Sequence, residues 1–286
     1  MNRRGVLPLD RLTLGFIVLF AAILLVQARE VAAWPWLLLG DALVVALVAL
    51  LPRLPAEGSF TAFVGGAYPL VLATAFYWQL GVIQVDVGRL HDIMVQRWEA
   101  AVFGAQLSTA WHARAPYPFL SAVLHLCYGS YYWILAGVPL FLFLRGKEEA
   151  FRRAVFVIAA ALYASYLVFG VFPVAGPYFT FPPVPAALTA SWPARYVYFM
   201  LGNGSSMGTA FPSSHVAASW VAVYAAWRGE RWLGVALAPV ALGLALGTVY
   251  GQFHYAVDAV VGALLAVALM ALADPLTSAL RPRPAA

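Results

Sequence analysis

Charged residues are scarce in this 286-residue chain, where Asp, Glu, Lys and Arg make up only 10%, against about 25% in an ordinary soluble domain. Apolar residues reach 63% and the mean hydropathy is +0.83. This composition excludes a soluble globular enzyme and a disordered protein. The single cysteine, Cys127, excludes a disulfide framework.

Two further classes are excluded by what the sequence lacks. The net charge is +5, but the 17 Lys and Arg residues are spread along the chain, so we expect no nucleic-acid partner. No Cys or His spacing is typical of zinc, and no acidic cluster is typical of magnesium or calcium. We therefore expect no metal and no other cofactor.

Long apolar runs are what the sequence has instead. A membrane-spanning helix needs about 20 mostly apolar residues, because hydrocarbon offers the backbone no hydrogen-bond partners. Eight segments meet this need: 12–28, 31–51, 60–80, 117–144, 154–173, 212–227, 232–250 and 255–273. The sequence thus predicts an all-α, polytopic membrane helix bundle. Its expected parts are two N-terminal spans (1–58), a six-helix core (59–275) with loops 81–116 and 174–211, and a tail (276–286).

The basic residues predict how the spans are oriented. Short cytoplasmic loops collect Lys and Arg, and eight spans with a cytoplasmic N-terminus place 12 of the 17 basic residues inside. These are Arg3, Arg4, Arg11, Arg53, Arg145, Lys147, Arg152, Arg153, Arg228, Arg231, Arg281 and Arg283. Both termini are then cytoplasmic, and the two long loops lie on the periplasmic or luminal side. The Ala-rich, Lys-poor composition favours a bacterial inner membrane.

The first outer loop contains a candidate helix at 89–104. Its apolar residues recur every four positions, and its polar residues share another face. The apolar set is Leu90, Met94, Trp98 and Val102, and the polar set is Asp92, Gln96 and Glu99. Two interpretations are open: a helix lying in the membrane interface with Trp98 at headgroup depth, or a linker helix packed across the top of the bundle.

Two histidines lie at the outer ends of predicted spans. His215 follows Pro212-Ser213-Ser214, where a proline and two hydroxyls are typical of a helix start. The free N–H groups of such a start bind anions. His254 and Asp258 are four residues apart and share one face of the last span. The carboxylate can fix the imidazole tautomer and leave the other nitrogen free to attack. A structural His–Asp pair is the alternative, but together these groups favour phosphoryl transfer.

These motifs resemble those of the type 2 phosphatidic acid phosphatase superfamily. Pro212-Ser-Ser-His215 is similar to its second motif, Pro-Ser-Gly-His, and His254-Tyr-Ala-Val-Asp258 to the His-x-x-x-Asp end of its third. The resemblance is strongest to the inositol phosphorylceramide synthase branch, which also has two extra N-terminal spans; sphingomyelin synthases share the His-Tyr-x-x-Asp ending. It implies a six-helix catalytic core, His254 as nucleophile, Asp258 as its orienting group and His215 as general acid.

The chain departs from the phosphatase branch in its cations. The Ser-Arg pair expected before the third motif is replaced by Gly247 and Thr248, and the first motif keeps Pro177 but neither cation. We expect neutral donors to bind the phosphate instead, with Arg195 either binding it or flanking Trp192 at the interface. The candidate substrate-binding residues are Ser213, Ser214, Tyr178, Pro177, Tyr250, Gln252 and Arg195.

Two other polar residues have open interpretations. Asp41, near the middle of a span, is either functional or paired with a Tyr or Ser on a neighbouring helix. His125, with Cys127, Tyr128 and Tyr131, lines a substrate cleft or is a hydrogen-bonded core residue.

The expected function is a lipid phosphotransferase at the outer leaflet, similar to inositol phosphorylceramide synthases and acting through a phosphohistidine. Its partners are the bilayer, a lipid phosphate and a hydroxyl acceptor, either a polyol or water. With water as acceptor the same chemistry describes a lipid phosphate phosphatase. A transporter or flippase is an alternative from another class, and it predicts charges at mid-span in several helices and broken helices.

The first prediction concerns the nucleophile. His254→Ala should abolish transfer, and Asp258→Asn should lower the rate by several orders of magnitude because the tautomer is no longer fixed. The measurement is turnover of a labelled lipid phosphate by the purified variants. Full activity of the His254 variant would contradict the mechanism.

Overall fold

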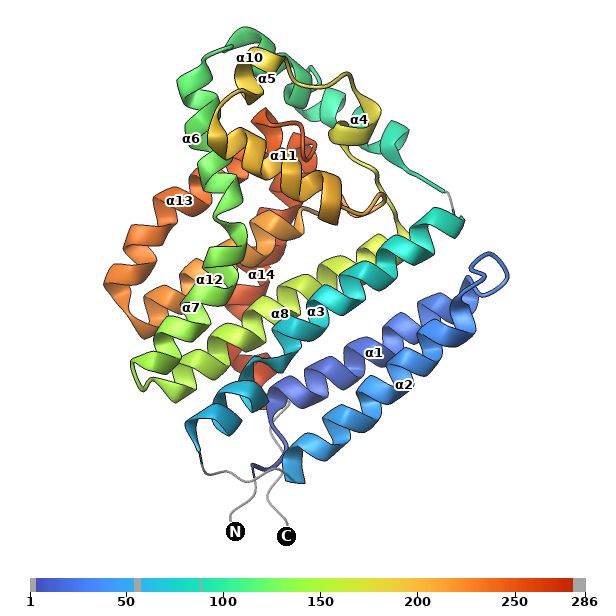
Figure 1. Ribbon diagram of the computed structural model, residues 1–286, viewed down its shortest axis with the longest axis vertical. Coiled ribbons are helices and arrows are strands. Elements are labelled where there is room, and N and C mark those ends of the chain that lie inside the picture. The colour runs from blue at the N-terminus through green and yellow to red at the C-terminus, as the bar shows by residue number, and fades with distance from the viewer. Residues whose placement is uncertain (1–3, 54–57, 88, 280–286) are drawn as a thin grey trace.

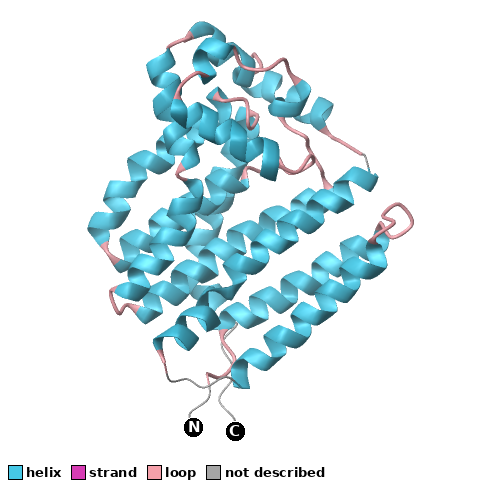
Figure 2. Ribbon diagram, viewed as in Figure 1, coloured by secondary structure: helices cyan, strands magenta, loops and turns pink. Residues whose placement is uncertain are grey.

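The computed structural model describes residues 4–53, 58–87 and 89–279. This part of the chain is 81% helix, with loops between the helices and no strand (Figure 2). The expected all-α fold is confirmed. The helices are α1 (Pro8–Val26), α2 (Trp34–Leu50), the 3-10 turn η1 (Leu51–Arg53), α3 (Ser59–Val87), α4 (Asp92–Phe103), α5 (Leu107–Arg114), α6 (Pro118–Gly129), α7 (Tyr131–Leu144), α8 (Glu148–Val171), α9 (Pro177–Thr180), α10 (Ala186–Thr189), α11 (Trp192–Gly204), α12 (Ser214–Gly229), α13 (Arg231–Tyr250) and α14 (Ala256–Ala279).

Six helices of the described chain are long and apolar enough to cross a membrane: α1, α2 with η1, α3, α8, α13 and α14. The pair α6 and α7, bent by 44°, adds a seventh if it is one span. The remaining predicted span corresponds to α12, which has only 16 residues. It begins at Ser214, two residues after Pro212, rather than at the proline. The eight-span count therefore stays a prediction.

The bend between α6 and α7 lies at Gly129 and Ser130, a residue pair that often kinks helices. The Ser130 hydroxyl donates to the Cys127 carbonyl at 2.6 Å and so competes with the helical hydrogen bonds. A Cβ on Gly129 would lie 3.2 Å from the Tyr196 ring. The predicted span 117–144 is thus two helices, with α11 packed closely at the break.

A buried ion pair attaches α1 to α3. The Arg4 guanidinium donates to both carboxylate oxygens of Asp10, at 2.8 and 3.0 Å, and to the Gly65 carbonyl at 2.6 Å. Pro69 has no N–H to donate to that carbonyl, which lies one turn earlier in α3. The Tyr68 hydroxyl also donates to Asp10, at 2.9 Å. The N-terminal helix pair is thereby fixed against the rest of the bundle (Figure 1).

The short helices α4, α5, α10 and α11 gather at one end of the bundle, at the top of Figure 1. The start of α12 lies beneath them, while the turn between α7 and α8 lies at the opposite end. There Lys147 pairs with Glu230 at 2.9 Å. The two long loops therefore cover one end of the molecule.

Helix α4 combines features of both earlier interpretations. Its apolar residues Met94, Trp98 and Val102 are exposed, as in an interfacial helix. Its carboxylates point the other way, because Asp92 and Glu99 are buried against the bundle. The helix is thus packed across the top of the bundle with its apolar face outward.

A test of the fold concerns Gly262 in α14. A Cβ there would lie 2.4 Å from the Ser213 carbonyl oxygen, a backbone atom that cannot move aside. Gly262→Ala should therefore destabilise the protein by about 1–3 kcal/mol through overpacking, measured as a lower Tm in detergent. Gly137→Ala is the control, since a Cβ at that helical position meets open space. A Gly262→Ala variant as stable as this control would contradict the close helix contact.

Candidate active site

His215 is placed by the start of α12. Ser213 is the N-cap residue, and its hydroxyl accepts from the Val216 N–H at 3.3 Å. The Ser213 N–H donates to the Asp258 carbonyl at 3.0 Å, which fixes the start of α12 against the first turn of α14. Within the described chain, the Ser214 and His215 N–H groups have no acceptor, as expected for a first helical turn.

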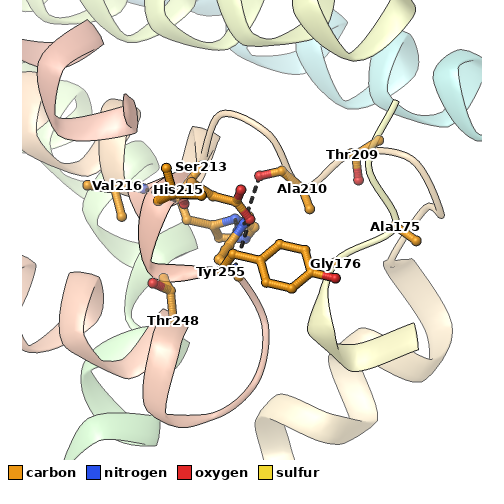
Figure 3. Close-up of polar contacts among 12 residues, drawn as sticks. Ala175, Gly176, Thr209, Ala210, Ser213, His215, Val216, Thr248 and Tyr255 are labelled. Atoms are coloured by element: carbon orange, nitrogen blue, oxygen red, sulfur yellow. Dashed lines mark hydrogen bonds and ion pairs between the residues drawn. The ribbon is translucent and has the colours of Figure 1, made fainter. Parts of the chain in front are cut away.

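His254 lies in the turn between α13 and α14. The N–H groups of Phe253 and His254 both donate to the Thr248 carbonyl, at 2.8 and 2.9 Å, so the chain turns sharply at the end of α13. Gln252 adopts φ 59° within this turn, a left-handed conformation that is uncommon for residues other than glycine. The turn brings His254 within hydrogen-bond distance of Ala210 and His215, both of which are labelled in Figure 3.

The hydrogen bonds around the two histidines assign their protons. Nδ1 of His254 lies 2.9 Å from the Ala210 carbonyl oxygen, which can only accept, so Nδ1 carries the proton and Nε2 is free. Nε2 lies 3.3 Å from His215 Nδ1, which therefore donates to it. The Tyr128 hydroxyl, 3.2 Å from His215 Nε2, completes a continuous chain of donors and acceptors.

Asp258 is fully buried beside this chain. Its Oδ2 lies 3.6 Å from His254 Nδ1, longer than a hydrogen bond, and accepts from the Tyr255 N–H at 2.9 Å. Its Oδ1 has no hydrogen-bond partner among the described residues. The tautomer of His254 is therefore held by a backbone carbonyl that sequence analysis missed, while Asp258 is placed to stabilise positive charge on the ring.

A cavity of about 290 Å³ opens beside His215. His215 and Ser214 line it together with residues of α3, α6, α7, α8 and α11 and Ser205. Apart from Thr74 and Ser205, that part of the wall is apolar, glycine or tyrosine. Its tyrosines are Tyr77, Tyr128, Tyr131, Tyr132, Tyr166 and Tyr196. Among the residues that the structure describes, no Lys or Arg lines it. The cavity thus has His215 and Ser214 at one end, and the rest of its wall is mostly apolar and tyrosine side chains.

The other predicted binding residues lie at different distances from this site. Ser213 and Ser214 are buried at the start of α12, next to His215. Gln252 and Tyr250 are buried in the turn before His254, and the Tyr250 hydroxyl donates to the Ala115 carbonyl at 2.8 Å. Of the seven predicted binding residues only Ser214 lines the cavity, and Arg195 is exposed on α11.

The outer arginines lie at the surface: Arg29, Arg89, Arg97, Arg114 and Arg195 are exposed, and Arg89 pairs with Glu30. Position 247, where the phosphatase branch has a serine, leaves no space for a side chain, since a Cβ on Gly247 would lie 2.6 Å from the Leu124 carbonyl. Within the described chain, no group of three His, Cys, Asp or Glu residues forms a metal site.

The structure places His125 and Asp41, each of which had two possible interpretations from the sequence. His125 is buried, its Nδ1 donates to the Ser121 carbonyl at 2.7 Å, and it does not line the cavity. Tyr128 and Tyr131 do line it. Asp41 accepts from Gln79 Nε2 at 3.3 Å, so its partner is neither a Tyr nor a Ser.

Paired histidines, a buried carboxylate and a free helix start thus lie together at one end of a membrane-type helical protein. A model of the PAP2 superfamily matches residues 93–272, a range that contains both histidine motifs. The chain belongs to the PAP2 superfamily. Comparison with curated proteins and with solved structures gives no match.

The proton assignment is testable by nitrogen NMR of protein labelled in its five histidines. We expect His254 and His215 both to carry the proton on Nδ1 at neutral pH. Tyr128→Phe removes the donor to His215 Nε2, so it should raise the Nε2-protonated population of His215 and leave His254 unchanged. Signals are assigned by His254→Gln and His215→Gln. A His254 protonated on Nε2 in the unmodified protein would contradict the assignment.

Proposed function

We propose that the chain is an integral membrane lipid phosphotransferase that acts through a phosphohistidine at His254, similar to inositol phosphorylceramide synthases. The observation that carries this proposal is the free Nε2 of His254 facing Nδ1 of His215 at 3.3 Å, beside the start of α12. Nucleophile, proton donor and anion-binding N–H groups thus share one small volume.

The proposed reaction has two steps. Binding of the phosphate anion first lets His215 take up a second proton from water at Nε2. The lone pair on His254 Nε2 attacks phosphorus, the bond to the leaving oxygen breaks, and that oxygen takes the Nδ1 proton of the His215 imidazolium. His215 is then neutral, with its proton on Nε2 and Nδ1 free. The acceptor hydroxyl then gives its proton to His215 and attacks phosphorus, which breaks the P–N bond. The two nitrogens are too close for a phosphoryl group between them. Substrate must therefore displace this hydrogen bond, and the half-buried His215 on the cavity wall is the side chain that moves.

The cavity supports a lipid as substrate. Its apolar wall suits acyl chains, and its polar end at His215 suits a phosphate. Because no described Lys or Arg lines it, a singly charged phosphodiester fits this site better than a dianionic monoester. A phosphatase acts on a monoester, so a site that suits a diester favours transfer over simple phosphatase action.

The proposed topology places the site at the outer leaflet. It counts α12 as a span, together with the pair α6 and α7, and gives eight spans with both termini in the cytoplasm. A helix of 16 residues is about 24 Å long, which suffices because α12 starts beneath the covering loop helices. Of the features that the transporter alternative predicts, the described residues show one bent helix pair, α6 and α7. They do not show charges at mid-span in several helices: the single mid-span carboxylate, Asp41, pairs with Gln79.

The test follows the phosphoryl group from donor to acceptor. Reconstituted protein is given a phosphodiester lipid or a phosphomonoester lipid, each labelled in the phosphate, with or without inositol or another polyol. We expect faster turnover of the diester, label in the polyol product, and acid-labile label on the protein that His254→Gln removes. The control His112→Gln, whose imidazole bonds to Ser108 within α5, should keep the label. With the polyol present, release of labelled phosphate from the monoester, or of a labelled phosphomonoester from the diester, identifies water as the acceptor and so a phosphatase type of reaction. No turnover of either lipid overturns the proposal.

A further inference from the structure

Two buried carboxylates of α4 contact the segment that links His254 to Asp258. Asp92 and Glu99 are seven residues apart, so they lie on one face of α4. They are 7% and 0% exposed, although α4 lies at the covered end of the bundle and its other face is open (Figure 1). Carboxylates are almost never fully buried without partners, so their contacts need an explanation.

Glu99 caps the helix that carries Asp258. Tyr255 precedes the first residue of α14, and its side chain cannot accept the N–H bonds that an N-cap Ser or Asp accepts. Glu99 Oε2 accepts from the Val257 N–H at 2.9 Å in its place. Its other oxygen accepts from the Leu107 N–H at 3.0 Å. Glu99 thus supplies from α4 an acceptor that α14 lacks, directly beside Asp258.

Asp92 holds the residue next to His254. Its Oδ1 accepts from the Tyr255 hydroxyl at 3.0 Å, and Gln96, on the same helix, donates to this hydroxyl at 2.9 Å. Burial raises the pKa of Tyr255, so the phenol stays protonated and remains a donor to the carboxylate. Asp92 therefore anchors the side chain that immediately follows the proposed nucleophile.

Asp92 also holds the loop that orients the Ala210 carbonyl. It accepts from the N–H groups of Ala175 and Gly176, at 2.8 and 2.9 Å. The preceding residue, Val174, accepts from the Ala210 N–H at 2.9 Å, and the Ala210 carbonyl in turn accepts from His254 Nδ1. Figure 3 shows the segment with Ala175 and Gly176 and the segment with Ala210, together with Tyr255. Asp92 is thus connected both to Tyr255, which follows His254 in the chain, and to the segment that holds the Ala210 carbonyl against the His254 ring.

We infer that Asp92 and Glu99 are positioning residues that hold His254 and Asp258 in register, and so fix the tautomer of His254. This inference rests on the proposed function for its rate effect but not for its effect on the tautomer. Neither carboxylate touches the cavity, so neither contacts substrate. They act through the backbone of 174–176 and 255–257.

The experiment compares Asp92→Asn, Glu99→Gln and Tyr255→Phe with the unmodified protein in detergent. An amide has one acceptor oxygen where the carboxylate has two, so each amide variant leaves at least one N–H without an acceptor. Glu149→Gln is the matched control, an exposed carboxylate at the start of α8. The three readouts are the nitrogen NMR signal of His254, kcat and KM on the phosphodiester lipid, and Tm.

We expect the Nδ1-protonated form of His254 to fall from the dominant species to a mixture in Asp92→Asn and Tyr255→Phe. In all three variants kcat should fall at least tenfold with KM within twofold, because substrate contacts are intact. The losses from Asp92→Asn and Tyr255→Phe should not multiply in the double variant, since both break one contact. The Glu149→Gln control should match the unmodified protein.

The inference is overturned if the His254 signal and kcat of folded Asp92→Asn and Glu99→Gln match the unmodified protein. It is also overturned if the fall in activity is fully explained by the lower stability, measured as Tm, while the His254 signal is unchanged. Tyr255→Phe removes a single oxygen atom and decides the matter for Asp92 if the carboxylate variants do not fold. If no lipid is turned over, the proposed function fails, and the His254 signal still decides the positioning role.

Discussion

The contact between the starts of α12 and α14 is the interaction on which the site depends. The Ser213 N–H donates to the Asp258 carbonyl, and Gly262 lets the α14 backbone approach the Ser213 carbonyl. Two helix starts meet here, each with N–H groups that need acceptors. Their approach places His215 and His254 within hydrogen-bond distance, although the two residues are 39 positions apart along the chain.

The acidic groups around this contact serve the backbone rather than a ligand. Asp258 accepts from the Tyr255 N–H, Glu99 from Val257, and Asp92 from Gly176. Hydrocarbon and closely packed side chains offer such N–H groups no water, so a carboxylate from another element must satisfy them. The cost of burying the charges is offset by these bonds, and the gain is a rigid setting for a single imidazole.

The sequence predicted the helical class, the two histidines and their meeting at one end of the bundle, because spans, helix starts and the spacing of His254 and Asp258 are local patterns. It did not predict the role of Ala210, since any residue supplies a carbonyl and only the turn geometry selects this one. It placed Asp92 and Glu99 on one face of a helix but not what that face contacts, which depends on long-range packing. The span count stays open at α12, whose 16 residues fall below the length of an ordinary span.

In the proposed reaction, the scarcity of charge that marks the sequence favours one kind of phosphate over another. Two unit charges about 4 Å apart interact by about 4 kcal/mol at an effective dielectric of about 20. No described cation lines the cavity, so the second charge of a monoester adds repulsion from Asp258 that nothing nearby cancels. A diester avoids this repulsion, and protonated His215 then supplies the one positive charge, which it loses as the leaving group departs. In the proposed reaction the positive charge beside the phosphate thus comes from the proton that His215 transfers, rather than from a Lys or Arg side chain.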